Sequence, residues 1–346
     1  MRTLITGATG YLGTWVARAV HAAGHRVRVL VRDATRPTPL RALELEVAKG
    51  DILDPASLQR AMCDVDAVIH VAGLVSLRNR DERQLAEVNI EGTRNVLDEA
   101  AQRRLRVLHT SSIGALGVTN EPIAVDESGA GARAVPLRYP YAESKRQSAE
   151  LALEHARAGL DVCVLLPGNV LGPGDSNATS TRLVSDYLAG RTRFYLPGGL
   201  SFADVRDVAA AYVSALERGR RGHSYLLAGV NLSYRELLEQ LRELTGLHRA
   251  FPTPWPIAQV SAWWSELSSV YFKHPFEEIN ANVIQYGSCF NYCDCSKAAS
   301  ELSYRTRPFS ETLRDTVLDL VARGSGFSAP LGGQLRGAPA GLNPEQ

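Results

Sequence analysis

The chain lacks a strong net charge. It has 38 Lys and Arg residues against 37 Asp and Glu residues, so its formal net charge is +1. A protein without a basic excess has no long-range field that attracts nucleic acid or an anionic membrane. Nucleic-acid partners are therefore not expected, and any bound phosphate must be held by a local arrangement of donors.

Cysteines and long apolar segments are also scarce. Five cysteines in 346 residues are an odd and small set, which does not fit a disulfide framework. No stretch of about 18 uncharged apolar residues occurs, so no membrane span is expected. The start MRTLITGATGYLG lacks the apolar run and cleavage site of a secretion signal. We therefore expect free thiols and a cytoplasmic location.

Short β-branched runs alternate with helical patterns in the first half of the chain. The expected strands are residues 2–6, 25–31, 66–72, 106–112 and 161–167, and the expected helices include residues 11–23 and 88–104. In residues 88–104 the apolar residues recur near the helical period of 3.6, at Val88, Ile90, Val96, Leu97 and Ala100. This alternation predicts an α/β fold with a doubly wound parallel sheet, the Rossmann arrangement.

The composition changes after Pro167, where Gly and Pro become frequent. We expect a dinucleotide-binding domain over residues 1–167, to which residues 200–227 return. A smaller, irregular α/β substrate domain is expected over 168–199 and 228–323, followed by a flexible tail over 324–346. Within the smaller domain, residues 231–246 predict a helix that is capped by Asn231 or Ser233 and stopped by Gly246.

A glycine-rich turn follows the first strand. TGATGYLG spaces Gly7, Gly10 and Gly13 three residues apart, between a strand and a helix. Small residues let the backbone approach a pyrophosphate, and the start of the helix supplies free N–H groups. The turn therefore predicts dinucleotide binding, although Thr6 and Thr9 are also suited to capping.

The end of the second strand bears on the choice of nucleotide. An acidic residue there accepts the 2′-hydroxyl of NAD, whereas a basic residue accommodates the 2′-phosphate of NADP. Arg32 stands at this place with Arg36 nearby, which favours NADP. The alternative is that Arg32 is a solvated surface residue and Asp33 takes the hydroxyl, so NAD stays open.

PYAESK places a phenol and an ammonium on one helix face. Tyr141 and Lys145 are four residues apart, so the ammonium can favour the ionised phenol. Ser111 and Ser112 follow the strand RVLHTSS at its carboxyl end, where ligands bind in open α/β sheets. A hydroxyl there can orient a carbonyl while the tyrosine protonates it and a nicotinamide supplies hydride.

Taken together, the motifs resemble those of a known family in both identity and order. The family is the extended short-chain dehydrogenases/reductases, and the resemblance rests on TGATGYLG, DILD, HVAG, VNIEGTRNVL, TSS, PYAESK, PGNVLGPGD and FADVRDVA. VRD and HVAG also resemble the dihydroflavonol reductase-like and 3β-hydroxysteroid dehydrogenase-like carbonyl reductases, including a bacterial branch associated with hopanoid synthesis. The resemblance extends from Met1 to about Arg323.

The resemblance implies a role for each site residue. Tyr141 is the catalytic acid/base, Lys145 lowers the pKa of Tyr141 and holds the nicotinamide ribose, and Ser112 polarises the substrate carbonyl. The cofactor-binding set is Thr6, Gly7, Thr9, Gly10, Tyr11, Leu12, Gly13, Arg32, Asp51, Ile52, Ala72, Gly73, Tyr141, Lys145, Pro167, Gly168, Asn169 and Val170. Leu166 departs from the family's frequent Arg before this proline. A homodimer through a four-helix contact is also implied, although monomers occur in the family.

Two further segments are open to more than one interpretation. Residues 251–275 are rich in aromatic residues on one helical face and fit either core packing or the roof of an apolar substrate pocket. Cys289, Cys293 and Cys295 lack zinc-site spacing, so no metal is expected. His109, beside the serines, is interpreted as a structural strand residue.

These observations predict an NADPH-dependent reductase that converts a ketone or aldehyde of a hydrophobic small molecule to an alcohol, or the reverse. One alternative is a sugar-nucleotide epimerase or dehydratase with tightly bound NAD. Another is a non-catalytic protein that senses NADP. The intact Ser112, Tyr141 and Lys145 argue against the sensor.

Overall fold

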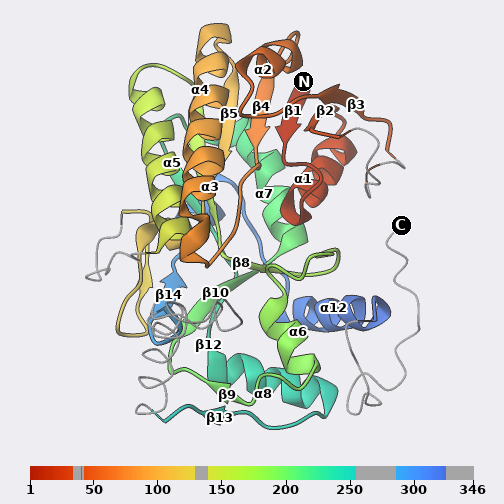
Figure 1. The fold of residues 1–346 in the computed structure, drawn as a ribbon, viewed down its shortest axis with the longest axis vertical. Helices are drawn as coiled ribbons and strands as arrows, with labels where there is room; N and C mark the ends of the chain where they lie inside the picture. Colours follow the sequence, from red (N-terminus) through yellow and green to blue (C-terminus); the bar gives the residue numbers. More distant parts are fainter. Residues whose placement is uncertain (34–39, 41–42, 129–138, 255–285, 325–346) are drawn as a thin grey trace.

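The structure, a computed structural model, describes residues 1–33, 40, 43–128, 139–254 and 286–324. Figure 1 shows a larger part, in which helices cover a sheet, above a smaller part that contains the second sheet and the helices α6, α8 and α12. Arg36, the aromatic stretch beyond Pro254 and the tail beyond Gly324 lie outside the described residues.

A seven-stranded parallel sheet forms the larger part. Its strand order is β11-β7-β5-β4-β1-β2-β3. The strands are β1 (Arg2–Thr6), β2 (Arg26–Val31), β3 (Glu46–Lys49), β4 (Ala67–His70), β5 (Arg106–Thr110), β7 (Val162–Pro167) and β11 (Ser224–Leu227). From β1 the chain moves outward to β2 and β3, and then crosses to β4 on the other side. The sheet therefore has its switch point between β1 and β4, where ligands bind in such folds.

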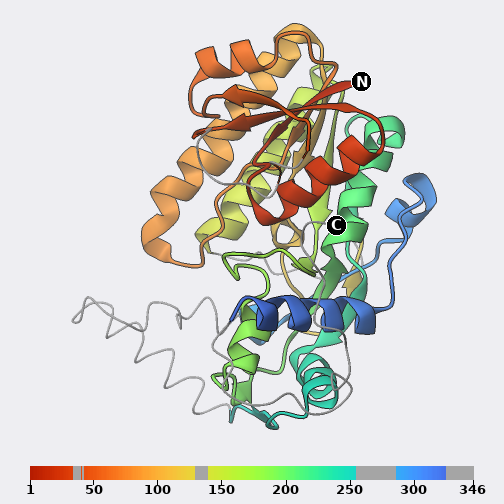
Figure 2. The ribbon, with the colours of Figure 1, turned by 90° about the vertical axis from the view of Figure 1, so that its right-hand side faces the viewer.

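Helices cover both faces of this sheet (Figures 1 and 2). One face carries α1 (Tyr11–Ala22) and α7 (Val205–Arg218), and the other carries α2 (Pro55–Ala61), α4 (Gly92–Arg103) and α5 (Pro140–Arg157). Fully buried Val16 and Val20 pack α1 into the first core, and Val96 and Leu97 pack α4 into the second. The predicted doubly wound α/β fold is confirmed, with β3 and β11 as strands that the sequence patterns did not indicate.

The smaller part is built around β10 (Gly199–Asp204). This strand pairs with β12 (Val230–Ser233), β14 (Phe290–Cys293) and β8 (Asn169–Leu171), and β14 pairs with β6 (Ala124–Val125). A separate two-stranded ribbon joins β9 (Phe194–Tyr195) to β13 (Phe251–Pro252). The other α-helices among the described residues are α3 (Glu82–Ala86), which lies beside α5, and α6 (Arg182–Leu188), α8 (Tyr234–Thr245), α11 (Ser296–Glu301) and α12 (Phe309–Ala322). α7 packs against the larger sheet and β11 is one of its strands, although both follow residue 167 in the chain. The division into domains at residue 167 stays a prediction.

The helix predicted over residues 88–104 has a different start. Residues Glu87–Glu91 form a π-helical turn between α3 and α4. Asn89 is buried, while Val88 and Ile90 on either side of it are only half-buried. Asn89 lies about two helical turns before buried Val96, so the two side chains share one face. The apolar pattern was therefore correct for Val96, Leu97 and Ala100, whereas in the first turn polar Asn89 faces the core in place of Val88 and Ile90.

Within the described ranges, no helix is long and apolar enough to cross a membrane.

The predicted helix of the smaller part begins with a reciprocal cap. The Ser233 hydroxyl accepts a hydrogen bond from the Glu236 N–H at 3.2 Å, and the Glu236 carboxylate accepts one from the Ser233 N–H at 2.8 Å. Asn231, the other predicted cap, lies inside β12 instead. Gly246 ends the helix at φ +72°, in the left-handed region that favours glycine.

Replacement of this cap tests the helix boundary. We expect Ser233→Ala to lower the free energy of unfolding by about 1 kcal/mol, because a helix N–H loses its partner. Ser300→Ala is the matched control, since Ser300 is an exposed residue inside α11. Urea unfolding of both variants measures the difference, and equal midpoints would contradict the capping role.

Candidate active site

The glycine turn lies between β1 and α1. Gly7 has φ +73°, and a Cβ there would lie 2.5 Å from the Ala72 nitrogen. A Cβ on Gly13 would overlap the Gly7 carbonyl, so both positions need glycine. The first turn of α1 has neither a side-chain cap nor an acidic residue, which leaves the positive end of the helix available. These features fit a dinucleotide pyrophosphate, and the named contacts stay predictions.

The chain after β4 joins this turn to the predicted catalytic lysine. The Ala72 N–H donates to the Thr6 hydroxyl at 3.3 Å. A Cβ on Gly73 would lie 3.0 Å from Lys145 Nζ, so the lysine reaches the backbone directly after Ala72. The structure thus brings the glycine turn, Ala72, Gly73 and Lys145 together at the switch point of the sheet.

The predicted Ser-Tyr-Lys group lies at the carboxyl end of β5. Ser112 caps a short 3₁₀ helix (Ile113–Leu116), and its hydroxyl accepts from the Gly114 N–H at 3.2 Å. Tyr141, in the first turn of α5, lies close enough to Ser112 for that hydroxyl to lower its pKa. Lys145 is 5% exposed and donates from Nζ to the Thr110 carbonyl at 3.0 Å. Ser111, in contrast, donates to the Lys145 carbonyl at 2.9 Å, which separates its position from that of Ser112.

Burial controls the protonation of this group. It raises the pKa of Tyr141, and the nearby Ser112 hydroxyl opposes that rise. It also lowers the pKa of Lys145 to about 8. Burial is the largest cause of the shift at both groups, and the Lys145 ammonium donates to the Thr110 carbonyl; its effect on the pKa of Tyr141 stays a prediction.

A buried polar network supports the site, and the sequence analysis did not find it. The Asn89 amide donates from Nδ2 to the Leu74 carbonyl at 3.0 Å and to the Ser144 hydroxyl at 2.9 Å, while Oδ1 accepts from the Leu74 N–H at 2.7 Å. The Ser144 hydroxyl in turn donates to the Tyr141 carbonyl at 2.8 Å. Asn89 therefore links the loop after β4 to the start of α5. Its signal in the sequence was its place seven residues before Val96, which puts this polar residue on the apolar side of an amphipathic helix.

The network continues from Asn89 to the glycine turn. The Thr93 hydroxyl donates to the Asn89 carbonyl at 2.7 Å and therefore accepts from His70 Nε2 at 3.1 Å. His70 Nδ1 then accepts from the Thr6 hydroxyl at 2.7 Å. Burial and the Lys145 charge lower the pKa of His70 to about 3, so this histidine is neutral. Thr6 thus has a structural role in addition to its predicted place beside the cofactor.

The other predicted cofactor residues lie around the same edge. Arg32 and Asp33 are exposed directly after β2. The Asp51 carboxylate accepts from the Leu53 N–H at 3.0 Å, and the Ile52 side chain is buried against Gly92. The residues that pass from β7 into β8, where the chain crosses from the large sheet to the second sheet, are Pro167, Gly168, Asn169 and Val170.

The remaining histidine and cysteine predictions concern packing. His109 is buried in β5, and its Nε2 lies 3.2 Å from the Ser148 hydroxyl. Cys293 packs in the core beside β7, and Cys295 Sγ accepts from the Ala228 N–H at 3.2 Å. In the part of the chain that the structure describes, no group of His, Cys, Asp or Glu is arranged to hold a metal ion.

Neutral His70 makes the stability of the protein depend on pH. Its pKa is about 3 when folded and about 6.5 in an unfolded chain, so the unfolded state binds more protons below pH 6.5. The stability is complete above that value and falls as the pH drops, by about 1.4 kcal/mol per unit. We expect His70→Gln to reduce this slope by that amount in urea unfolding between about pH 6.5 and pH 5. An unchanged slope would show that His70 is protonated in the fold.

Comparisons with known proteins agree with this geometry. Residues 3–228 match the model of the NAD dependent epimerase/dehydratase family. The chain is 36% identical to sterol demethylase protein B of Methylococcus capsulatus over 253 residues, which are 71% of this chain and 75% of that protein. It is 31% identical over 325 residues to a candidate dihydroflavonol 4-reductase of Synechocystis, with 90% of this chain and 92% of that protein covered.

A solved structure extends the agreement to the whole fold. The crystal structure of gox2253 matches with a TM-score of 0.81 and 29% identity, and the match covers 93% of this chain and 98% of that chain. The resemblance drawn from the sequence motifs is confirmed, and the chain belongs to the NAD dependent epimerase/dehydratase family, among the extended short-chain dehydrogenases/reductases.

Proposed function

We propose that the protein is an NADPH-dependent reductase that converts a ketone or aldehyde of an apolar small molecule to an alcohol, or catalyses the reverse reaction. The observation that carries the proposal is the position of buried Lys145, whose Nζ lies against Gly73 and the Thr110 carbonyl, on the same helix as Tyr141 and at the edge that also holds Ser112 and the glycine turn. Membership of the family implies an NAD(P) cofactor. When bound, that cofactor supplies or accepts a hydride.

The site residues divide the remaining work. The glycine turn would hold the pyrophosphate, and Lys145 would hold the nicotinamide ribose, since its ammonium lies against Gly73 beside the turn. Ser112 would donate a hydrogen bond to the substrate carbonyl, and Tyr141 would deliver the proton to its oxygen. Because burial raises the pKa of Tyr141, the phenol is protonated and ready to act as an acid.

The names of two relatives support an apolar substrate. One is named for a sterol and the other for a dihydroflavonol, which are ring compounds with large apolar surfaces. The second name is also that of a carbonyl reductase. Sugar-nucleotide chemistry with tightly bound NAD is the alternative within the same family, and Arg32 after β2 argues against it.

Replacement of the phenol tests the catalytic role. We expect Tyr141→Phe to lower kcat by about 10²–10⁴-fold, because the acid is lost, while NADPH affinity stays similar. Tyr139→Phe is the matched control, since its ring lies 6.2 Å from that of Tyr141 and is equally part of the local packing. The two variants are compared by turnover on a panel of apolar carbonyl compounds and by cofactor titration. Full turnover by Tyr141→Phe would remove the tyrosine from the chemistry, whereas cofactor binding without turnover of any compound by the wild type would favour the sensor interpretation.

The nucleotide preference has its own test. We expect Arg32→Ala to weaken NADPH binding by about 10–150-fold and to leave NADH binding unchanged, because a charge-assisted contact with the 2′-phosphate contributes about 1.5–3 kcal/mol. Arg26→Ala, an exposed arginine at the other end of β2, should change neither affinity. Fluorescence titration measures both cofactors. NAD that copurifies with the protein, or equal binding of NADH by the wild type, would favour the epimerase or dehydratase alternative.

A further inference from the structure

Two phenylalanines stand side by side on the surface of the smaller part. β9 and β13 are parallel, and Phe194 is the direct register partner of Phe251. Register partners in adjacent strands point to the same face. Their side chains are 61% and 54% exposed, which is unusual for adjacent aromatic rings in a soluble domain.

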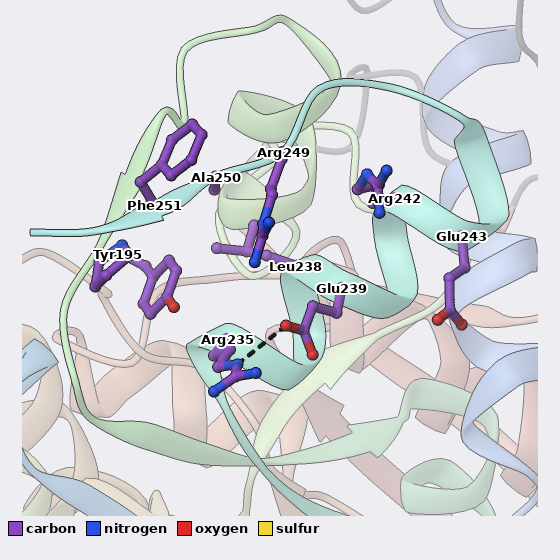
Figure 3. Close-up of a pocket in the computed structure, with 10 residues that line it drawn as sticks. Tyr195, Arg235, Leu238, Glu239, Arg242, Glu243, Arg249, Ala250 and Phe251 are labelled. Carbon is purple, nitrogen blue, oxygen red and sulfur yellow. Dashed lines mark hydrogen bonds and ion pairs between the residues drawn. The ribbon is translucent and has the colours of Figure 1, made fainter.

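The neighbouring residues of the ribbon point the other way. Figure 3 shows Tyr195 turned toward α8 and Leu238, whereas the Phe251 ring points away from that helix. Tyr195 therefore anchors the ribbon to the domain, while both phenylalanines stay exposed and Phe251 also lines the cavity between the ribbon and α8. The exposure of this pair does not arise from poor packing of the strands.

The charge around the pair has one sign. Residues 190–195 and 247–254, which we call the phenylalanine tip, contain Arg191, Arg193 and Arg249 and no Asp or Glu. The Arg249 guanidinium lies 5.9 Å from the centre of the Phe251 ring. Arg193 donates to the Gly190 carbonyl at 3.1 Å, and Arg191 is paired with Asp186 at 2.5 Å, so the pairing neutralises only one of the three.

A cavity beside the tip extends this surface. It has a volume of about 280 Å³ and lies between the ribbon and the exposed face of α8 (Figure 3). Arg235, Arg242 and Arg249 line it together with Glu239 and Glu243. Because Glu239 accepts from Arg235 at 3.0 Å, Arg242, Arg249 and Glu243 leave a net positive charge in the opening.

We propose that the phenylalanine tip docks the protein on the surface of a membrane that contains anionic phospholipid. Phenylalanine rings fit the boundary between headgroups and acyl chains, and arginines attract the phosphates of the headgroups. The tip lies at one end of the long axis of the molecule, so it can reach a flat surface (Figure 1). Docking is peripheral and reversible, and it does not depend on the proposed reductase activity.

The charge and the apolar rings have separable effects. Each arginine near an anionic surface contributes about a fivefold increase in partitioning, and this contribution disappears on neutral lipid. The rings contribute on both kinds of lipid, because their burial does not depend on charge. A small apolar area with a few charges gives weak binding that rises with the fraction of anionic lipid.

Sedimentation of the full chain with vesicles tests the proposal. One set of vesicles is phosphatidylcholine and the other is an equal mixture of phosphatidylcholine and phosphatidylglycerol. We expect the wild type to sediment mainly with the mixture. Arg193→Gln with Arg249→Gln should lower binding to the mixture about 30-fold, and Phe194→Ser with Phe251→Ser should lower it at least about tenfold. Val47→Ser, at an exposed apolar residue of β3, is the control and should bind as the wild type does.

The same variants distinguish other occupants of the tip. The proposal is wrong if the wild type sediments with neither vesicle, or if the phenylalanine variant sediments as the wild type does. It is also wrong if the tip joins two copies of the chain, which analytical ultracentrifugation would reveal as a dimer that the phenylalanine substitutions dissociate. Unchanged circular dichroism of each variant establishes that a loss of binding is not a loss of folding.

Discussion

The carboxamide of Asn89 is the interaction on which the candidate site depends. It is buried, and its partners are the backbone of Leu74 after β4 and the hydroxyl of Ser144 in α5. A buried amide with both ends bonded fixes the distance between the two elements, because a shift of either one leaves a polar group without a partner. The positions of Gly73 and Tyr141 follow from that distance.

The neutral state of the surrounding groups makes this arrangement possible. His70 is fully buried close to the Lys145 ammonium, and a second charge there would be strongly disfavoured. The histidine instead joins Thr6 and Thr93 as one donor and one acceptor. One buried charge, that of Lys145, is thus held among neutral hydrogen-bonding groups and the Thr110 carbonyl.

The sequence predicted those parts of the fold whose conformation depends on residues close together in the chain. The glycine turn, the first strands and α1 were readable, because backbone conformation and apolar periodicity there depend on near neighbours. The Ser, Tyr and Lys were found by motif, but their protonation was not, since burial is a property of the assembled core. Asn89, Thr93 and Ser144 were missed because their roles arise from contacts between distant segments. β3 and β6 were missed because such short edge segments have little pattern.

The π-helical turn at Glu87–Glu91 fixes the length of the chain between α3 and α4. A single extra residue in a helix rotates everything that precedes it by about 100° relative to an uninterrupted helix. Deletion of one residue between Asn89 and Gly92 would therefore turn Asn89 away from the face that it shares with Val96, even though every side chain in the site kept its identity. The number of residues in this segment therefore matters for the site as much as their identity does. A homologous sequence with a gap at this turn would need a different contact to join β4 to α5.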